Sequence, residues 1–146
     1  MKTFIRQIDQ ARIEQAVAAA ERLTSGEIRI VVLPGKVAEP LNAAEAEFTR
    51  LGMQQTRERN AVLILIAPES RNFVIFGDQA VHAKCGEAFW REVAQAMQAH
   101  FQAGAFTTAI IEGIERAGRL LAKEFPRRPD DTNELPDRII VGHPVI

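Results

Sequence analysis

Hydrophobic and polar residues recur along this chain in patterns that predict helices and strands in turn. Apolar residues at helical spacing between positions 5 and 20 predict a first helix, with Asp9 available as an N-cap and Gly26 available to end it. Residues 27–33 (EIRIVVL) are rich in β-branched side chains and are followed by Pro34-Gly35. This second segment therefore predicts a strand.

The middle of the chain predicts a helix and then a hairpin. Asn42 and Glu45 have the spacing of a capping box, so we expect a helix over residues 43–55. Residues 61–67 (AVLILIA) are apolar at every position, which indicates a central strand covered on both faces. A polar turn then leads into residues 73–76 (FVIF), which predict a third strand paired with the second.

Two amphipathic helices and a proline-containing tail complete the predicted elements. Residues 86–102 and 106–121 each place apolar side chains on one helical face. In the tail, residues 125–146, prolines prevent a long helix, and residues 139–141 predict a short edge strand. We expect one domain over residues 1–146, with the rest of the tail packed on its body as loop.

The order of the predicted elements determines which polar segments meet. A strand, a helix and a second strand predict a right-handed parallel crossover, and the hairpin adds a third, antiparallel strand, giving an α/β fold with a mixed sheet. The starts of the two parallel strands then share an edge with the end of the third strand. Residues 25–27, 57–60 and 77–78 are therefore expected to converge there.

The converging segments carry oxygen ligands. The carboxylates of Glu27 and Asp78 and the amide of Asn60 are hard donors, which suit Ca²⁺ or Mg²⁺ better than zinc. We expect Arg59 and His82 to contact these ligands without contacting the cation themselves. The alternative interpretation is that the two carboxylates are ordinary charges that pair with neighbouring arginines.

Composition excludes several other classes of function. The chain has 146 residues, 47% hydrophobic and 25% charged, with a net charge of −1, so no overall field would hold it to nucleic acid or to an anionic membrane. Its longest apolar run, residues 61–67, is far shorter than the roughly 20 residues that a transmembrane helix needs. The N-terminus lacks a signal-peptide core. We therefore expect a cytoplasmic protein that binds no nucleic acid and does not insert into a membrane.

Two further motifs favour a structural interpretation over a chemical one. Cys85 and Arg91 have the Cys-x5-Arg spacing of cysteine phosphatases, but Glu87 would place a negative charge in the phosphate cradle, so a small buried thiol is favoured. The acidic residues between Asp130 and Asp137 lack the glycine of an EF-hand loop. We expect that segment to be solvated or paired locally.

Several segments, in this order and spacing, resemble the TPM-domain family, and in particular its short bacterial members. They are residues 25–29 (SGEIR), 59–64 (RNAVLI), 73–78 (FVIFGD), the pair Phe89-Trp90 with Met97 and Phe101, and residues 125–137 (FPRRPDDTNELPD). The resemblance covers almost the whole chain. It implies a three-layer α/β/α sandwich around a small mixed sheet, in agreement with the order of elements.

The resemblance also implies divalent-cation binding, chiefly of Ca²⁺, by loops at one end of the sheet. We carry this over to Glu27, Asp78 and Asn60, which the topology already places at one edge. Two functions follow as hypotheses: an accessory domain that binds Ca²⁺ or Mg²⁺ and supports a protein partner, or a weak metal-dependent acid phosphatase acting on phosphate monoesters. The first is preferred because the chain offers carboxylates but no evident nucleophile or general base.

Overall fold

A mixed four-stranded sheet, in the order β3-β2-β1-β4, forms the centre of the molecule. In this computed structural model, residues 2–127 and 139–141 are described, apart from the side chains of Lys2, Phe89 and Val141. The strands are β1 (Glu27–Val32), β2 (Ala61–Ala67), β3 (Asn72–Gly77) and β4 (Ile140–Val141). β1 runs parallel to β2 and β4, whereas β3 is antiparallel to β2, which confirms the predicted crossover, hairpin and edge strand.

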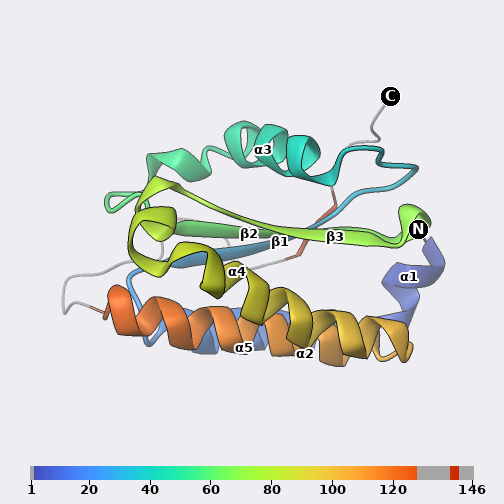
Figure 1. Cartoon of the computed structure of the whole chain (residues 1–146). Coiled ribbons are helices and arrows are strands. Elements are labelled where there is room, and N and C mark those ends of the chain that lie inside the picture. The colour runs from blue at the N-terminus through green and yellow to red at the C-terminus, as the bar shows by residue number, and fades with distance from the viewer. Residues whose placement is uncertain (1, 128–138, 142–146) are drawn as a thin grey trace.

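Helices cover both faces of the sheet and give the predicted three layers. The helices are α1 (Lys2–Gln7), α2 (Gln10–Glu21), α3 (Pro40–Arg50), α4 (Gln79–Gln102) and α5 (Phe106–Glu124), with short 3-10 turns η1 (Met53–Gln55) and η2 (Pro68–Ser70). Figure 1 shows α3 on one face and α2, α4 and α5 on the other. None of the helices in the described part of the chain is long and apolar enough to cross a membrane.

The core lies on both sides of β2, as its apolar sequence predicts. Alternate side chains, including Ile64 and Ile66, pack towards α2, α4 and α5, while Leu63 and Leu65 pack towards Phe48 of α3. Every residue of β2 is 2% exposed or less. A strand buried on both faces has no polar face, which is why its side chains show no alternation.

Three helix boundaries differ from the prediction. The first predicted helix is divided at Asp9, whose carboxylate accepts a hydrogen bond of 3.1 Å from the Arg12 N–H and caps α2. α2 ends at Glu21, before Gly26. α3 begins at Pro40, since proline suits the first helical turn. The capping box was therefore wrong: Asn42 donates to the Glu39 carboxylate at 2.8 Å instead.

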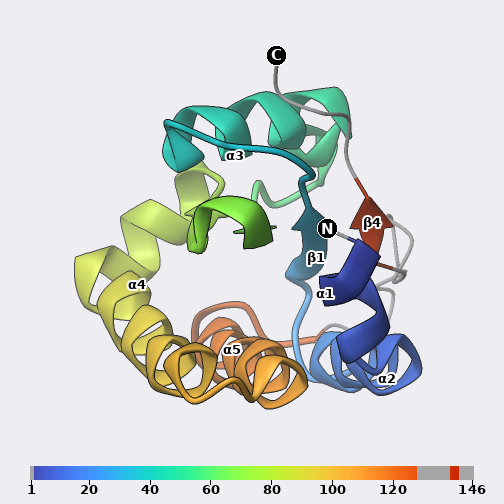
Figure 2. The ribbon, with the colours of Figure 1, turned by 90° about the vertical axis from the view of Figure 1, so that its right-hand side faces the viewer.

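α4 begins seven residues earlier than predicted, directly after β3. The Asp78 carboxylate accepts a hydrogen bond of 2.8 Å from the Gln79 N–H and caps this helix. Gly86, where the helix was expected to start, instead interrupts it with a φ of 71° and a ψ of −175°. Figure 2 shows the resulting bend, which carries α4 from the side of α3 towards α5.

The described parts of the tail are held against the body of the domain. Phe125 is buried, and Pro126 forms an isolated β-bridge with Thr24. The Arg127 guanidinium donates to the Glu21 carbonyl at 2.9 Å. The acidic segment from Asp130 to Asp137 lies outside the described residues.

Candidate metal site at the polar rim of the sheet

Three polar segments from distant parts of the chain meet at one end of the sheet, as the topology predicts. Glu27, at the start of β1, is in register with Ala61 at the start of β2. The Asp78 N–H, at the end of β3, donates to the Ala61 carbonyl at 2.9 Å. We call this end of the sheet the polar rim and define it by Ser25, Glu27, Glu58, Arg59, Asn60 and Asp78.

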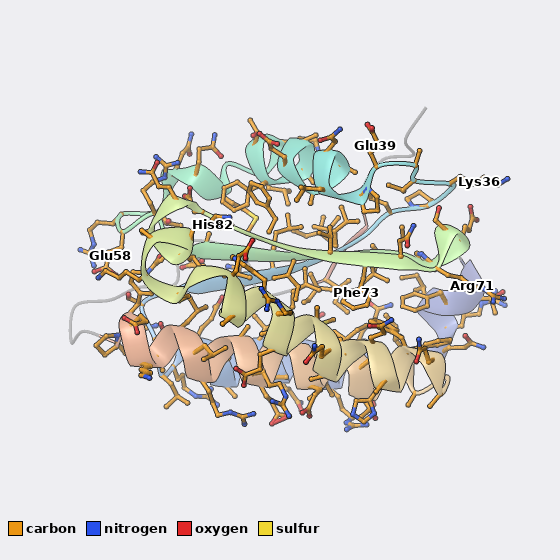
Figure 3. All side chains as sticks on the ribbon, viewed as in Figure 1. Lys36, Glu39, Glu58, Arg71, Phe73 and His82 are labelled. Atoms are coloured by element: carbon orange, nitrogen blue, oxygen red, sulfur yellow. The ribbon has the colours of Figure 1, made fainter. Side chains whose placement is uncertain are left out.

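A cluster of three side chains forms the centre of the polar rim. The Ser25 hydroxyl donates to Glu58 Oε2. Asn60 Nδ2 lies 3.0 Å from Ser25 Oγ and 3.2 Å from Glu58 Oε2. Asn60 is buried, whereas Ser25 and Glu58 are partly exposed, so the cluster is anchored in the fold and open to solvent. Figure 3 shows Glu58 at this end of the molecule.

Of these three residues, only Asn60 was predicted as a ligand. The prediction had placed the segments of Ser25 and Glu58 at the rim without choosing their side chains. Glu58 lies in a turn before β2, and Arg59 has a φ of 53°, so the alternation of side chains along a strand does not apply to Glu58 and Asn60. The Ser25 contact depends on how the loop before β1 returns to the sheet.

Asp78, a predicted ligand, pairs with Arg59. Arg59 Nε and Nη2 donate to the two carboxylate oxygens at 2.7 and 2.9 Å. This hydrogen-bonded pairing raises the pKa of Arg59, mainly through the bond to Asp78. The Asp78 side chain is 6% exposed but that of Arg59 is 40% exposed, so the arginine covers the carboxylate from the solvent side.

Glu27, the other predicted carboxylate, belongs to a buried ion-pair network. Its Oε2 lies 2.9 Å from Nη2 of Arg29, and Nη1 of Arg29 lies 2.7 Å from Oε2 of Glu21. The side chains of Arg29 and Glu27 are 1% and 3% exposed. Buried charges are stable only when paired and hydrogen-bonded, so Glu27 and Glu21 together stabilise Arg29.

The same network completes the edge of β1. Among the described residues, β4 pairs with β1 at Val31 and Val32. Nearer the start of β1, the Ile28 N–H donates to Glu21 Oε2 at 2.7 Å. The end of α2 thus provides an acceptor for this N–H of β1.

His82 lies on the first turn of α4, beside the rim. The backbone N–H of His82 donates to the backbone carbonyl of Asp78 at 3.2 Å. The His82 side chain is exposed, and its ring centroid lies 5.2 Å from that of Trp90. The structure therefore connects His82 to Asp78 through the backbone and places its ring on Trp90. Its predicted supporting role in ligand binding stays a prediction.

Two glycines allow the segments of the rim to approach one another. A Cβ on Gly26 would lie 3.2 Å from the Asn60 carbonyl oxygen, so the loop before β1 packs closely on β2. A Cβ on Gly77 would lie 2.3 Å from Cη2 of Trp90, which no side chain could tolerate without movement. Gly77 therefore lets Trp90 cover the backbone next to Asp78.

Cys85 was predicted to be a buried thiol and is partly buried in the structure. Burial raises its pKa, and the nearby Glu124 carboxylate raises it further, with Lys84 opposing the shift. Arg91, the partner expected from the Cys-x5-Arg spacing, lies 3.4 Å from Glu87. A raised pKa reduces the thiolate that cysteine phosphatases use as nucleophile. These observations favour the structural interpretation.

The donor set at the rim determines what kind of cation it suits. Among the described residues, no group of three or more His, Cys, Asp or Glu side chains is placed to hold a metal ion. A cation at the rim would therefore rely on hydroxyl, amide and water oxygens in addition to carboxylates. Such a set suits Ca²⁺ or Mg²⁺ and excludes the thiolate or imidazole coordination that zinc prefers.

Comparison with known proteins identifies the family. The sequence model of the family described as the TPM domain matches residues 1–120 of this chain. The chain belongs to the TPM-domain family. All residues of the polar rim lie within the matched region of this TPM domain. None of the curated proteins compared with the chain matches it.

Two solved structures share the fold of this TPM domain. The NMR structure of the BA42 protein from the psychrophilic bacterium Bizionia argentinensis is 38% identical, with a TM-score of 0.86, and the alignment covers 91% of this chain and 92% of that one. The NMR structure of the N-terminal domain of a protein from P. gingivalis is 18% identical, with a TM-score of 0.66 over 82% of this chain and 79% of that one. The second likeness shows the fold alone.

Proposed function

We propose that this TPM domain binds Ca²⁺ or Mg²⁺ at the polar rim and acts as an accessory domain for a protein partner. The observation that carries the proposal is the meeting of Ser25, Glu58 and Asn60, which come from two separate loops. Hydroxyl, carboxylate and amide oxygens are the ligands that both cations prefer.

The amide of Asn60 fits a cation site after one rotation. Its two hydrogen bonds within the described part of the chain both use Nδ2. The two ends of a side-chain amide are assigned from their hydrogen bonds, and turning the amide by about 180° would exchange them. Oδ1 would then face Ser25 and Glu58, so that all three residues present oxygen.

Asp78 is the second carboxylate that we assign to the site. Its partner Arg59 is 40% exposed and has room to turn into solvent, so a cation would compete with Arg59 for the carboxylate. Glu27 is different, because its partner Arg29 is 1% exposed and has no such room. We therefore assign Glu27 to holding Arg29 beside the site, and water to the remaining positions of a cation with six to eight ligands.

Thermal unfolding with Ca²⁺, Mg²⁺ or EDTA tests the cation site. A ligand that binds only the folded state stabilises it by about 2.7 kcal/mol at a concentration one hundred times its Kd. We expect millimolar Ca²⁺ or Mg²⁺ to raise the Tm above that in EDTA. The rise should be lost in Glu58→Gln and reduced in Asp78→Asn.

Glu45→Gln is the matched control, since Glu45 is exposed on α3, away from the polar rim. It should keep the full response to the cation. An unchanged Tm of the parent domain at millimolar Ca²⁺ and Mg²⁺ would contradict the proposal. An equal response in Glu58→Gln and Glu45→Gln would move the site elsewhere.

Release of phosphate from an aryl phosphate tests the alternative function, a metal-dependent acid phosphatase. A bound cation would supply an activated water to such a reaction. Cation-dependent release that is lost in Glu58→Gln and kept in Cys85→Ser would replace the accessory role with a catalytic one. Loss in Cys85→Ser alone would instead favour a thiolate nucleophile.

A further inference from the structure

A groove of about 910 Å³ runs between β3 and α4 and reaches the end of the sheet opposite the polar rim. We call it the edge groove. Phe73 and Ile75 of β3 line one side, and Trp90 and Phe101 of α4 line the other. Figure 3 shows Phe73 on the α4 side of the sheet, and Arg71 and Glu58 at opposite ends of the molecule.

β3 is an edge strand with little protection. It follows β2 at the end of the sheet, and no other strand of the described chain pairs with its outer side. Residues 73–76 are partly exposed, whereas all of β1 and β2 is buried. The sequence NFVIFG contains no charge and no proline. Edge strands usually carry lysine, proline or a bulge against pairing with other chains, and β3 has none of these along its six paired residues.

The charge along the edge groove is asymmetric. Of the residues that line it in the described structure, only Arg71 is charged, and the other polar ones include the amides of Asn72, Gln98 and Gln102. Arg71 precedes β3, and its φ of 52° places it in the left-handed region at the end of η2. The groove is therefore apolar along its length and positive at the end where β3 begins.

We propose that the edge groove binds an extended peptide strand of a partner protein, added antiparallel to β3, with an acidic group at its carboxyl end beside Arg71. The backbone of the peptide would pair with the outer edge of β3, and alternate apolar side chains would enter the groove. The direction follows from charge. An antiparallel strand ends where β3 begins, so it brings its carboxyl end to Arg71, whereas a parallel strand would bring its amino end there.

The peptide strand would be the part of the protein partner, named in the proposed function, that this domain recognises. Its binding to the edge groove does not require the cation. Peptide binding at the edge groove is measured in EDTA, so its failure is separate from a failure of the cation site. Two other occupants, a small amphipathic acid and a second copy of the chain, are outcomes of the same experiment.

Trp90 makes the groove directly measurable, because it lines the groove and is the one tryptophan of the sequence. The probe is an acetylated peptide, Thr-Val-Thr-Val-Thr-Asp, which matches the six residues of β3 in length. We expect it to change the Trp90 fluorescence saturably and to slow hydrogen exchange of amides in β3. A peptide with proline in place of both the second threonine and the second valine should bind at least tenfold more weakly, because the N–H of one of these adjacent residues faces β3 and is lost as a backbone donor.

Variants of the protein test the charge and the place of binding. Arg71→Asn suits the left-handed backbone and should weaken binding about fivefold, as the loss of an exposed ion pair would, while Arg71→Lys should keep most of it. Gln98→Glu places a negative charge on the groove and should weaken binding. Gln95→Glu is the matched control, since Gln95 is exposed on the same helix but does not line the groove.

Four results would overturn the proposal. The first is no response of Trp90 to the peptide up to millimolar concentration. The second is equal binding of the proline peptide, which would exclude strand addition. The third is saturable binding of decanoate that displaces the peptide and is much tighter, which would make the groove a site for small amphipathic acids. The fourth is a dimer in sedimentation that the peptide dissociates, since it would make a second copy the occupant.

Discussion

The polar rim and the edge groove lie on the same sheet but present opposite surfaces. At the rim, strand ends and loops bring charged side chains together, and arginines pair with two of the carboxylates, Glu27 and Asp78. Along the edge groove, apolar side chains of β3 and α4 face a channel in which Arg71 is the charged lining residue. Ion pairs thus hold the carboxylates of the rim in place. The groove, in contrast, is the space between β3 and α4, whose side chains do not fill it.

Trp90 is the point where the two regions touch. It lines the edge groove, and its ring packs over Gly77, the residue before Asp78. Its ring also lies beside that of His82. The two regions thus differ in chemistry but share the contact of Trp90 with Gly77, and variants can disturb either region alone or both together.

Arg29→Met should have the largest effect, and it acts on the buried network that holds Glu27 of the rim. Removing the guanidinium takes the cation away from two carboxylates that are 6% exposed or less. Breaking a buried ion pair from one side costs about 3–5 kcal/mol of the free energy of unfolding. Urea unfolding followed by circular dichroism measures this loss.

Arg91→Met is the control for that experiment, because its pair with Glu87 joins side chains that are 68% and 90% exposed. It should cost less than about 1 kcal/mol. Similar losses in the two variants would show that the Arg29 network contributes no more than a surface pair. The buried ion pairs would then not distinguish the stability of the rim from that of the edge groove.

Gly77→Ala should have an intermediate effect and should disturb both regions. The new methyl group would meet the six-membered ring of Trp90, so the ring or the backbone must move. Overpacking of this kind costs about 1–3 kcal/mol of the free energy of unfolding. The Trp90 fluorescence of the folded protein should shift as well.

A double variant, Gly77→Ala with Trp90→Phe, checks the cause. The smaller ring leaves space for the methyl group, so the cost of Gly77→Ala should be lower in this background when unfolding is followed by circular dichroism. If the cost is unchanged, the contact between Gly77 and Trp90 does not couple the rim to the groove.

Cys85 should give the smallest effect, visible as a pH dependence. Because burial raises the pKa of the folded thiol, the neutral form is favoured by folding. This contribution to stability is complete below the pKa of the unfolded thiol and is lost as the pH rises through the higher pKa of the folded state. The rate of alkylation by iodoacetamide should therefore rise at a higher pH in the folded protein than in urea. A rise at lower pH would indicate an activated thiolate.

Sequence patterns predicted the strands well, because each strand has a local composition that fits one environment. The apolar run of β2 was assigned with its observed ends, residues 61–67, since a strand covered on both faces needs no polar position. β1 and β3 were assigned to within one residue at each end. The parallel crossover followed from connection rules, and with it the convergence of Glu27, Asn60 and Asp78 at one end.

Helix boundaries were predicted less well, because they depend on single side chains. Asp9 was available as a cap and does cap α2, but it also separates α1 from it. Asp78 was considered only as a ligand, although it caps α4. The sequence pattern predicts a helix start at Gly86, which is instead a bend inside the helix.

The sequence by itself determined the fold class, the strand order around the crossover and the end of the sheet where oxygen donors meet, because periodicity and connection rules act over short stretches of chain. Tertiary structure decided which of those donors face one another. Arg29 pairs with Glu21 as well as Glu27, and Arg59 turns to Asp78, because burial forces each charge to find a partner wherever the fold brings one. The edge groove could not be predicted from local sequence patterns, since it is the space left between the edge strand β3 and α4, a helix that bends at Gly86.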